Sequence, residues 1–196
     1  MSGGGILSQS HHENESFQRL NILDADVGAH RWESCNFTKC NFSNSRLGSN
    51  SFINCTFTDC DLSNVTVASA SFVSVAFVRC KMLGIKWTEA KQLLFSITLE
   101  SCNVSFNNFF GMKLKKIKMF DCRAEGAIFS EANMSGANLQ KTNFESALFE
   151  NTNLTGTDFS DATDYDIDVL NNKVKNAIFT LPDAVRLLRS LDIKVQ

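Results

Sequence analysis

The strongest pattern in the chain is a large apolar residue at every fifth position. It runs without a gap from residue 17 to residue 87, and after one interruption it resumes at residue 94 and continues to residue 159. This period fits neither an α-helix, in which side chains repeat every 3.6 residues, nor a strand, in which they repeat every 2. It fits a chain that turns a corner every five residues, so that four repeats close a square coil and each coil buries its faces against its neighbours.

A second ladder of small side chains stands two residues before each large one. It holds mostly cysteine, alanine and threonine, and the remaining three positions of each repeat are mostly polar. Each repeat therefore points one large and one small side chain inward, and the stacked coils form an all-β solenoid. We expect a core ladder of large side chains that includes Phe37, Phe57, Phe77, Phe129, Phe144 and Phe149.

All seven cysteines belong to the small ladder: Cys35, Cys40, Cys55, Cys60, Cys80, Cys102 and Cys122. An odd number argues against a complete disulfide framework, and inward positions are typical of compact buried thiols. A metal site needs converging thiolates, whereas the spacing here is that of the repeat itself. We expect reduced cysteines, no metal, no cofactor and a cytoplasmic location, where thiols stay reduced.

The interruption from Trp87 to Leu94 is two residues longer than a repeat. If the chain forms a bulge at a corner near residues 88–93, the coils continue in step. Cys102 and Cys122 then join the column that contains Cys40, Cys60 and Cys80. The alternative is a short external turn that restarts the solenoid on another face.

Apolar residues outside both ladders gather around this interruption. They are Val73, Val78, Leu83, Phe95, Phe106, Phe110 and Phe120. One interpretation is a local distortion of the coils that covers these side chains. The other is an exposed apolar surface, between residues 95 and 120, that binds a partner.

Both ends of the chain depart from the repeat. We expect residues 1–14 to form a flexible tail without a signal peptide, residues 15–180 to form the solenoid, and residues 181–196 to form an α-helix and a short strand that cap it. The cap either serves one chain alone or also forms a homodimer interface. The residues expected in that interface are Pro182, Ala184, Leu187, Leu188, Leu191 and Ile193.

Charge is nearly balanced overall, with a net charge of -2, yet acidic residues dominate the segment from Glu125 to Asp168. Such a run is usually a solvated face. The alternative is a surface that imitates the phosphates of duplex DNA, which carries one charge per about 1.7 Å of its axis. The acidic residues expected to bind a partner are Glu125, Glu145, Glu150, Asp158 and Asp161.

Catalytic and membrane-spanning functions find no support in the sequence. The three histidines, His11, His12 and His30, lack a nucleophile or a carboxylate framework nearby. No apolar run approaches the roughly 18 residues of a membrane span. The charge balance also differs from the basic surface of a nucleic-acid binder, so we expect neither an enzyme, nor a membrane protein, nor direct nucleic-acid binding.

The units Ala132-Asn133-Met134-Ser135-Gly136 and Ala137-Asn138-Leu139-Gln140-Lys141 resemble the A(D/N)LXX consensus of the pentapeptide-repeat family. This resemblance covers nearly the whole chain and implies a right-handed quadrilateral β-helix. The segments from Cys80 to Thr88 and from Tyr165 to Ile193 are similar to the branch of albicidin-resistance and quinolone-resistance (Qnr) proteins.

That resemblance implies a function. Proteins of this branch are dimeric rods, joined through C-terminal helices, that mimic DNA, act on DNA gyrase and protect this type II topoisomerase from poisons. It therefore implies resistance or self-immunity to a poison such as albicidin or a quinolone. The alternative is a protein-interaction scaffold or effector module that uses the apolar surface around residues 95–120.

Overall fold

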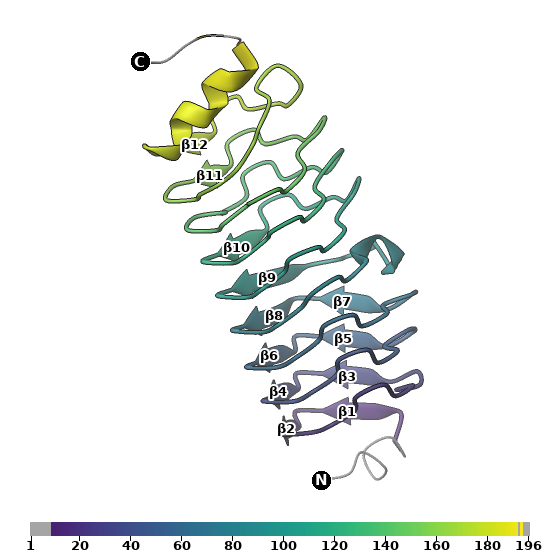
Figure 1. The fold of residues 1–196 in the computed structure, drawn as a ribbon. Helices are drawn as coiled ribbons and strands as arrows, with labels where there is room; N and C mark the ends of the chain where they lie inside the picture. The colour runs from purple at the N-terminus through teal and green to yellow at the C-terminus, as the bar shows by residue number, and fades with distance from the viewer. Residues whose placement is uncertain (1–8, 192, 194–196) are drawn as a thin grey trace.

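The computed structural model describes residues 9–191 and 193, which form a rod of stacked four-sided coils (Figure 1). In the second coil the inward residues of the four sides are Trp32, Phe37, Phe42 and Leu47, and we number the sides first to fourth in that order. Strands on one side pair in parallel with a register of 20 residues, as between Phe37 and Phe57. The solenoid predicted from the five-residue period is confirmed.

Two sheets hold the regular strands. The first side carries β1 (His11–Glu13), β3 (Arg31–Glu33), β5 (Ser51–Ile53) and β7 (Ser71–Val73). The second side carries β2 (Ser16–Gln18), β4 (Asn36–Thr38), β6 (Thr56–Thr58), β8 (Val75–Val78), β9 (Ile97–Glu100) and β10 (Lys118–Phe120). The same side continues through Asn138 to β11 (Asp158–Phe159) and β12 (Ile178–Phe179). Single parallel bridges join the coils on the third and fourth sides.

The chain turns most of its corners at a residue in the left-handed conformation. Asn44 and Asn54, for example, have φ values of 56° and 53°. This conformation costs an ordinary L-residue about 1–2 kcal/mol, and asparagine, aspartate and glycine tolerate it best. Most corner residues with positive φ are Asn, Asp, Ser or Gly, so the polar positions of the repeat specify the corners.

The predicted phenylalanine ladder forms the core. Phe37, Phe57 and Phe77 are fully buried and stack with ring centroids 4.5 and 5.1 Å apart. Phe129 stacks on Phe149 at 5.1 Å, and Phe144, which is also fully buried, meets Phe149 edge to face. Stacked and edge-to-face aromatic pairs add about 0.5–1.5 kcal/mol each to the free energy of burial.

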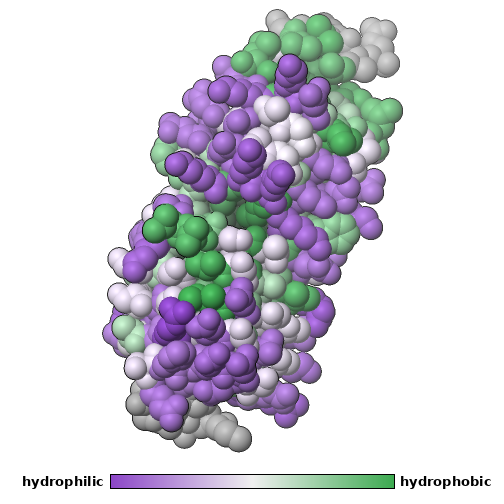
Figure 2. Space-filling view, turned by 180° about the vertical axis from the view of Figure 1, so that it is seen from behind, coloured by the Kyte–Doolittle hydropathy of each residue, from purple (hydrophilic) through white to green (hydrophobic). Residues whose placement is uncertain are grey.

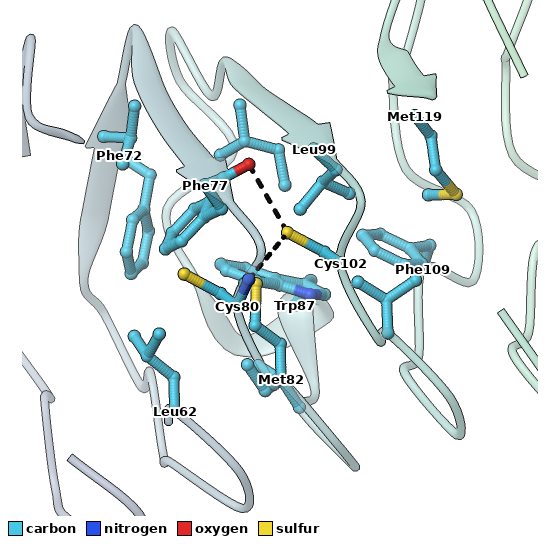
Figure 3. Packing of buried hydrophobic residues seen from close by; sticks show 14 of the residues in the cluster. Leu62, Phe72, Phe77, Cys80, Met82, Trp87, Leu99, Cys102, Phe109 and Met119 are labelled. Atoms are coloured by element: carbon cyan, nitrogen blue, oxygen red, sulfur yellow. Dashed lines mark hydrogen bonds between the residues drawn. The ribbon is translucent and has the colours of Figure 1, made fainter. Parts of the chain in front are cut away.

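The interruption is a bulge, and the coils continue in step beyond it. The register widens from 20 to 22 residues, because Phe77 pairs with Leu99. The short 3-10 helix η2 (Trp87–Glu89) begins the bulge at the edge of the rod (Figure 1). The predicted cysteine column is intact, since the Cys80 N–H donates to Cys102 Sγ at 3.4 Å (Figure 3). The alternative of a restart on another face is wrong.

The N-terminal boundary was misplaced, because the first side begins at His11 rather than after a tail that extends to residue 14. β1 pairs with β3, and His12 is only 3% exposed. The imidazole of His12 lies 4.2 Å from the Trp32 ring and parallel to it. A histidine thus occupies an inward position that other repeats fill with a large apolar residue. Because histidine is polar, the apolar pattern did not reveal this first repeat. The rest of the predicted tail, residues 1–8, lies outside the described residues.

The C-terminal cap is helical, but η3 (Asp183–Leu191) is a 3-10 helix and not the expected α-helix. Val185 N–H, for instance, donates to the Pro182 carbonyl three residues earlier. Three residues per turn align side chains at i and i+3, so the apolar residues fall on two faces instead of one stripe. Of the predicted strand after it, Asp192 and residues 194–196 lie outside the described residues.

Candidate interaction surface

The acidic residues expected to bind a partner lie on three sides of the rod. The bridge between Arg123 and Asn143 places Glu125 and Glu145 one above the other on the third side. Glu150 lies on the fourth side, two residues after Leu148, which is bridged to Ile128. Asp158 lies on the second side, and Asp161 lies at the corner between the second and third sides. The structure therefore brings together only Glu125 and Glu145.

Neighbouring groups change the charge that these carboxylates present. Glu125 forms an ion pair with Arg123 and accepts two hydrogen bonds from its guanidinium. Burial acts to raise the pKa of Asp158, but hydrogen bonds from Ser160 and Gln140 outweigh it and hold that pKa below its usual value. Glu145 and Glu150 are exposed, and within the described chain neither forms an ion pair. Their side chains are therefore free to contact a partner.

Lysines gather in two groups on the first side of the second half, a feature that our sequence analysis missed. Lys113, Lys115 and Lys116 lie on the first side, and Lys173 and Lys175 follow three coils later, as the bridges from Lys113 through Asn133 and Asn153 to Lys173 show. All five are exposed. Sorting charged residues by their side of the coil, rather than by segment, is the signal that reveals these two groups.

An apolar strip runs from the corner between the third and fourth sides onto the fourth side; we define it as Phe106, Phe110, Ile128 and Leu148. Phe106, Phe110 and Leu148 are 61%, 47% and 47% exposed, and Ile128 is half-buried. Figure 2 shows apolar side chains gathered in the middle of the face seen from behind. A Cβ at Gly126 would come within 2.7 Å of the Phe106 ring, so glycine lets this ring lie against the next coil.

Some of the apolar residues outside the two ladders are covered by their neighbours, and others form an exposed surface. Phe95 is half-buried and packs edge-on against Phe72 and Trp87. Phe120 is half-buried between the ammonium groups of Lys118 and Lys141, which lie 5.6 and 5.5 Å from its centroid. Val73, Val78 and Leu83 are half-buried. Of the four phenylalanines that lie outside the ladders, Phe106 and Phe110 are the exposed ones.

The cysteine thiols are chemically quiet. All seven are free and buried, and Cys60 and Cys102 donate to the carbonyls of Phe37 and Phe77 at 3.4 Å. Because a carbonyl only accepts, these thiols carry their protons. Burial raises the pKa of Cys55 to about 11. In residues 9–191 and 193, no group of three His, Cys, Asp or Glu side chains converges as a metal ion requires.

The expected dimer residues divide between two faces of η3. Leu187 is half-buried and packs against the solenoid core. Val185, Leu191 and Ile193 are 41%, 43% and 53% exposed, while Ala184 and Leu188 are half-buried and Pro182 is exposed. Three-residue periodicity aligns Pro182, Val185, Leu188 and Leu191 on an outward face. Our sequence analysis did not include Val185, which lies beside Leu188 on this outward face.

No helix among the described residues is long and apolar enough to cross a membrane.

The histidines form no catalytic arrangement with a nucleophile. His12 and His30 stack with Trp32 at the N-terminal end of the core, and His11 is exposed in β1. What the described surface offers to other molecules is its charged groups and its apolar strip.

Comparison with solved structures shows the same fold over nearly the whole chain. Trypsin-treated QnrB1, a plasmid-mediated fluoroquinolone resistance protein, superposes with a TM-score of 0.61 at 22% identity, over 95% of this chain and 97% of QnrB1. HetL, a pentapeptide repeat protein involved in heterocyst differentiation regulation in the cyanobacterium Nostoc sp. strain PCC 7120, superposes with a TM-score of 0.70 at 13% identity, over 91% and 92% of the two chains. At these identities the likeness establishes the fold alone.

No curated protein sequence matches this chain. Two family models do match it. The pentapeptide repeat region model covers residues 30–109, and the model of eight pentapeptide repeats covers residues 120–163. Together with the square coils, the two inward ladders and the likeness to QnrB1 and HetL, these matches show that the chain belongs to the pentapeptide-repeat family.

Proposed function

We propose that this protein is a non-catalytic DNA mimic that binds DNA gyrase or a related type II topoisomerase and protects it from a poison such as albicidin or a quinolone. The observation that carries the proposal is the polarity of the second half of the rod. Glu125 and Glu145 stack on the third side, and exposed lysines lie on the first side at residues 113, 115 and 116 and, three coils later, at residues 173 and 175. A DNA-binding enzyme presents a basic surface, which the glutamate side complements.

The proposal includes a homodimer that joins two such rods. The outward face of η3 leaves Val185 and Leu191 exposed, and Leu181 beside it is 78% exposed. Apolar surface at the end of a solenoid is typical of a capping or subunit contact. A two-fold axis at this end would align the glutamate columns of two chains into one longer acidic surface, and the free buried thiols fit the reducing cytoplasm.

Supercoiling by purified DNA gyrase tests the proposal. The protein is titrated into the reaction with albicidin, with ciprofloxacin and without a poison. We expect supercoiling to recover in the presence of one poison, with less cleaved DNA trapped on the enzyme. Folded protein at micromolar concentration that neither restores supercoiling with either poison nor alters it without one would contradict the proposal.

The second candidate function is a protein-interaction scaffold that binds through the apolar strip. It is favoured by the exposure of Phe106 and Phe110, because large exposed aromatics commonly anchor protein interfaces. HetL has this fold and a regulatory role, so the fold alone does not select between the two. Under this candidate, Phe106→Ser and Phe110→Ser abolish partner binding, and charge reversal at Glu125 and Glu145 leaves it intact.

A further inference from the structure

The hydrogen-bond ladder of the fourth side breaks at its last coil. In the preceding coil, Phe129 N–H donates to the Leu148 carbonyl at 2.9 Å and Glu131 N–H donates to the Glu150 carbonyl at 2.7 Å. One coil later, the N–H groups of Phe149 and Asn151 find no acceptor among the described residues. The Ala147 carbonyl likewise receives no hydrogen bond from this part of the chain. A short strand edge is therefore left open.

Specific contacts hold this edge open. The segment 164–171, which would have continued the ladder, is drawn toward the C-terminal helix. Asp164 N–H donates to Asp183 Oδ1 at 3.1 Å, and Arg186 donates to Asp164 Oδ1 at 2.7 Å. The Asn172 amide then spans the gap, because its Nδ2 donates to the Phe149 carbonyl at 2.8 Å and to the Asp168 carbonyl at 2.9 Å. The separation is thus built into the fold.

Between the open edge and the displaced segment lies a groove that is rich in negative charge. Glu150, Asp166 and Asp168 line it, and no lysine or arginine is among its lining residues. Leu148, the last residue of the apolar strip, stands at its mouth. The groove therefore combines free backbone donors, an apolar contact and three carboxylates.

These features define the chemistry of an occupant. An extended peptide placed along an open strand edge can accept hydrogen bonds from Phe149 and Asn151 and donate one to Ala147, which is strand addition. Side chains at alternate positions of that peptide would point outward beside the carboxylates of Glu150 and Asp168. Basic side chains complement them, whereas the phosphates of nucleic acids and anionic lipids are repelled.

We propose that this groove binds an extended, basic segment of another protein by strand addition at Ala147–Asn151. The proposal does not depend on the topoisomerase function. The bound segment places basic residues at alternate positions and completes the fourth side where the chain itself leaves it incomplete.

The first test uses the full chain and a fluorescent peptide, acetyl-Arg-Val-Arg-Val-Arg-amide, followed by anisotropy. Two matched peptides separate backbone from charge: one is N-methylated at its arginines, and the other has glutamate in place of arginine. We expect binding of the first peptide to be at least about tenfold tighter than that of either control. If the N-methylated peptide binds as tightly as the unmodified arginine peptide, charge attraction alone explains the binding and strand addition is wrong.

Amide hydrogen exchange gives a second readout at the edge itself. In the free protein, the amides of Phe149 and Asn151 should exchange at least about tenfold faster than those of Phe129 and Glu131, their counterparts one coil earlier. The peptide should protect both edge amides. Protection that is already complete without the peptide would show that the edge is closed, and the proposal would fail. A fall in molecular mass on peptide addition would assign the groove to a second copy of the chain instead.

A paired substitution tests the carboxylates. Glu150→Gln with Asp166→Asn changes two exposed groove residues, and we expect at least about a tenfold loss of affinity for the arginine peptide. The matched control, Asp24→Asn with Glu89→Gln, removes the same charge from exposed sites in the first half and should bind as wild type does. Equal loss in both variants would contradict a site in the groove.

Discussion

The two halves of the rod share one interior and differ in their surfaces. In the first half, charged residues on successive coils pair with one another, as Arg46 does with Asp26 and Arg79 with Asp59. In the second half such pairs also form, as between Lys118 and Glu100, but the lysines on the first side form none within the described chain, and neither do Glu145 and Glu150. The inward ladders are the same in kind on both sides of the bulge. The comparison teaches that the repeat determines the fold, whereas the outward positions are free to carry a function.

The largest effect should come from the shared interior. Phe57→Ala in the first half and Phe144→Ala in the second each remove a fully buried ring, and each should lower the free energy of unfolding by about 3–5 kcal/mol. Urea denaturation measures both losses. A variant in either half that unfolds at the wild-type denaturant concentration would show that the halves do not share one kind of core.

Disruption of the end of the second half should change the assembly. Val185→Asp combined with Leu188→Asp places two charges on the outward face of η3, so we expect light scattering to report half the wild-type mass. Leu93→Asp alters an apolar residue in the bulge that is 80% exposed, and it should leave the mass unchanged. Wild-type protein that is already monomeric at micromolar concentration would refute the dimer.

Alkaline pH should lower the free energy of unfolding through the buried thiol of Cys55, in the first half of the rod. Folding raises the pKa of Cys55 from 9.0 to about 11, so the unfolded chain releases this proton first as the pH rises. The contribution of Cys55 to stability is full below pH 9 and is lost between about pH 9 and 11. Urea denaturation at several pH values should show a shallower decline for Cys55→Ala than for wild type. If the stability of both proteins falls equally with pH, the Cys55 thiol ionises as easily in the folded protein as in the unfolded chain.

The smallest effect on stability should come from the apolar strip. Phe106→Ser and Phe110→Ser change exposed rings, and such surface substitutions usually stay within about 0.5 kcal/mol. These substitutions distinguish a strip that is only a surface feature from one that contributes to the core. An unfolding loss as large as that of Phe144→Ala would show that the strip is a structural part of the second half rather than a free surface.

Much of the fold was predictable because the repeat leaves its signal in the residues themselves. The period of five identified Phe37, Phe57 and Phe144 as core residues. The two extra residues after Trp87 left a bulge and an external turn as alternatives, and the 22-residue register shows the bulge. The prediction failed where a polar residue occupies an inward position of the repeat. His12 is such a residue, and its imidazole stacks on Trp32. It also did not anticipate that η3 is a 3-10 helix, in which Leu187 packs against the core and Val185 is exposed.

The candidate surface was harder to predict, because its residues are brought together by the register of the coils and not by their nearness in sequence. Glu150, Asp158 and Asp161 are close in the chain yet lie on different sides. Phe110, Ile128 and Leu148 are far apart in the chain yet form one strip. The open edge at Phe149 depends on contacts of Asn172 and Asp164, which the repeat pattern does not contain.

The most direct test of the account is a supercoiling assay that compares charge reversal in the two halves. Glu125→Lys with Glu145→Lys alters the stacked acidic column, and Asp24→Lys with Glu89→Lys makes the same change of charge in the first half. The account predicts that the second-half variant loses at least about tenfold of its protection of gyrase while the first-half variant protects as wild type does. Equal protection by all three proteins, or equal loss in both variants, would contradict the claim that the second half carries the function.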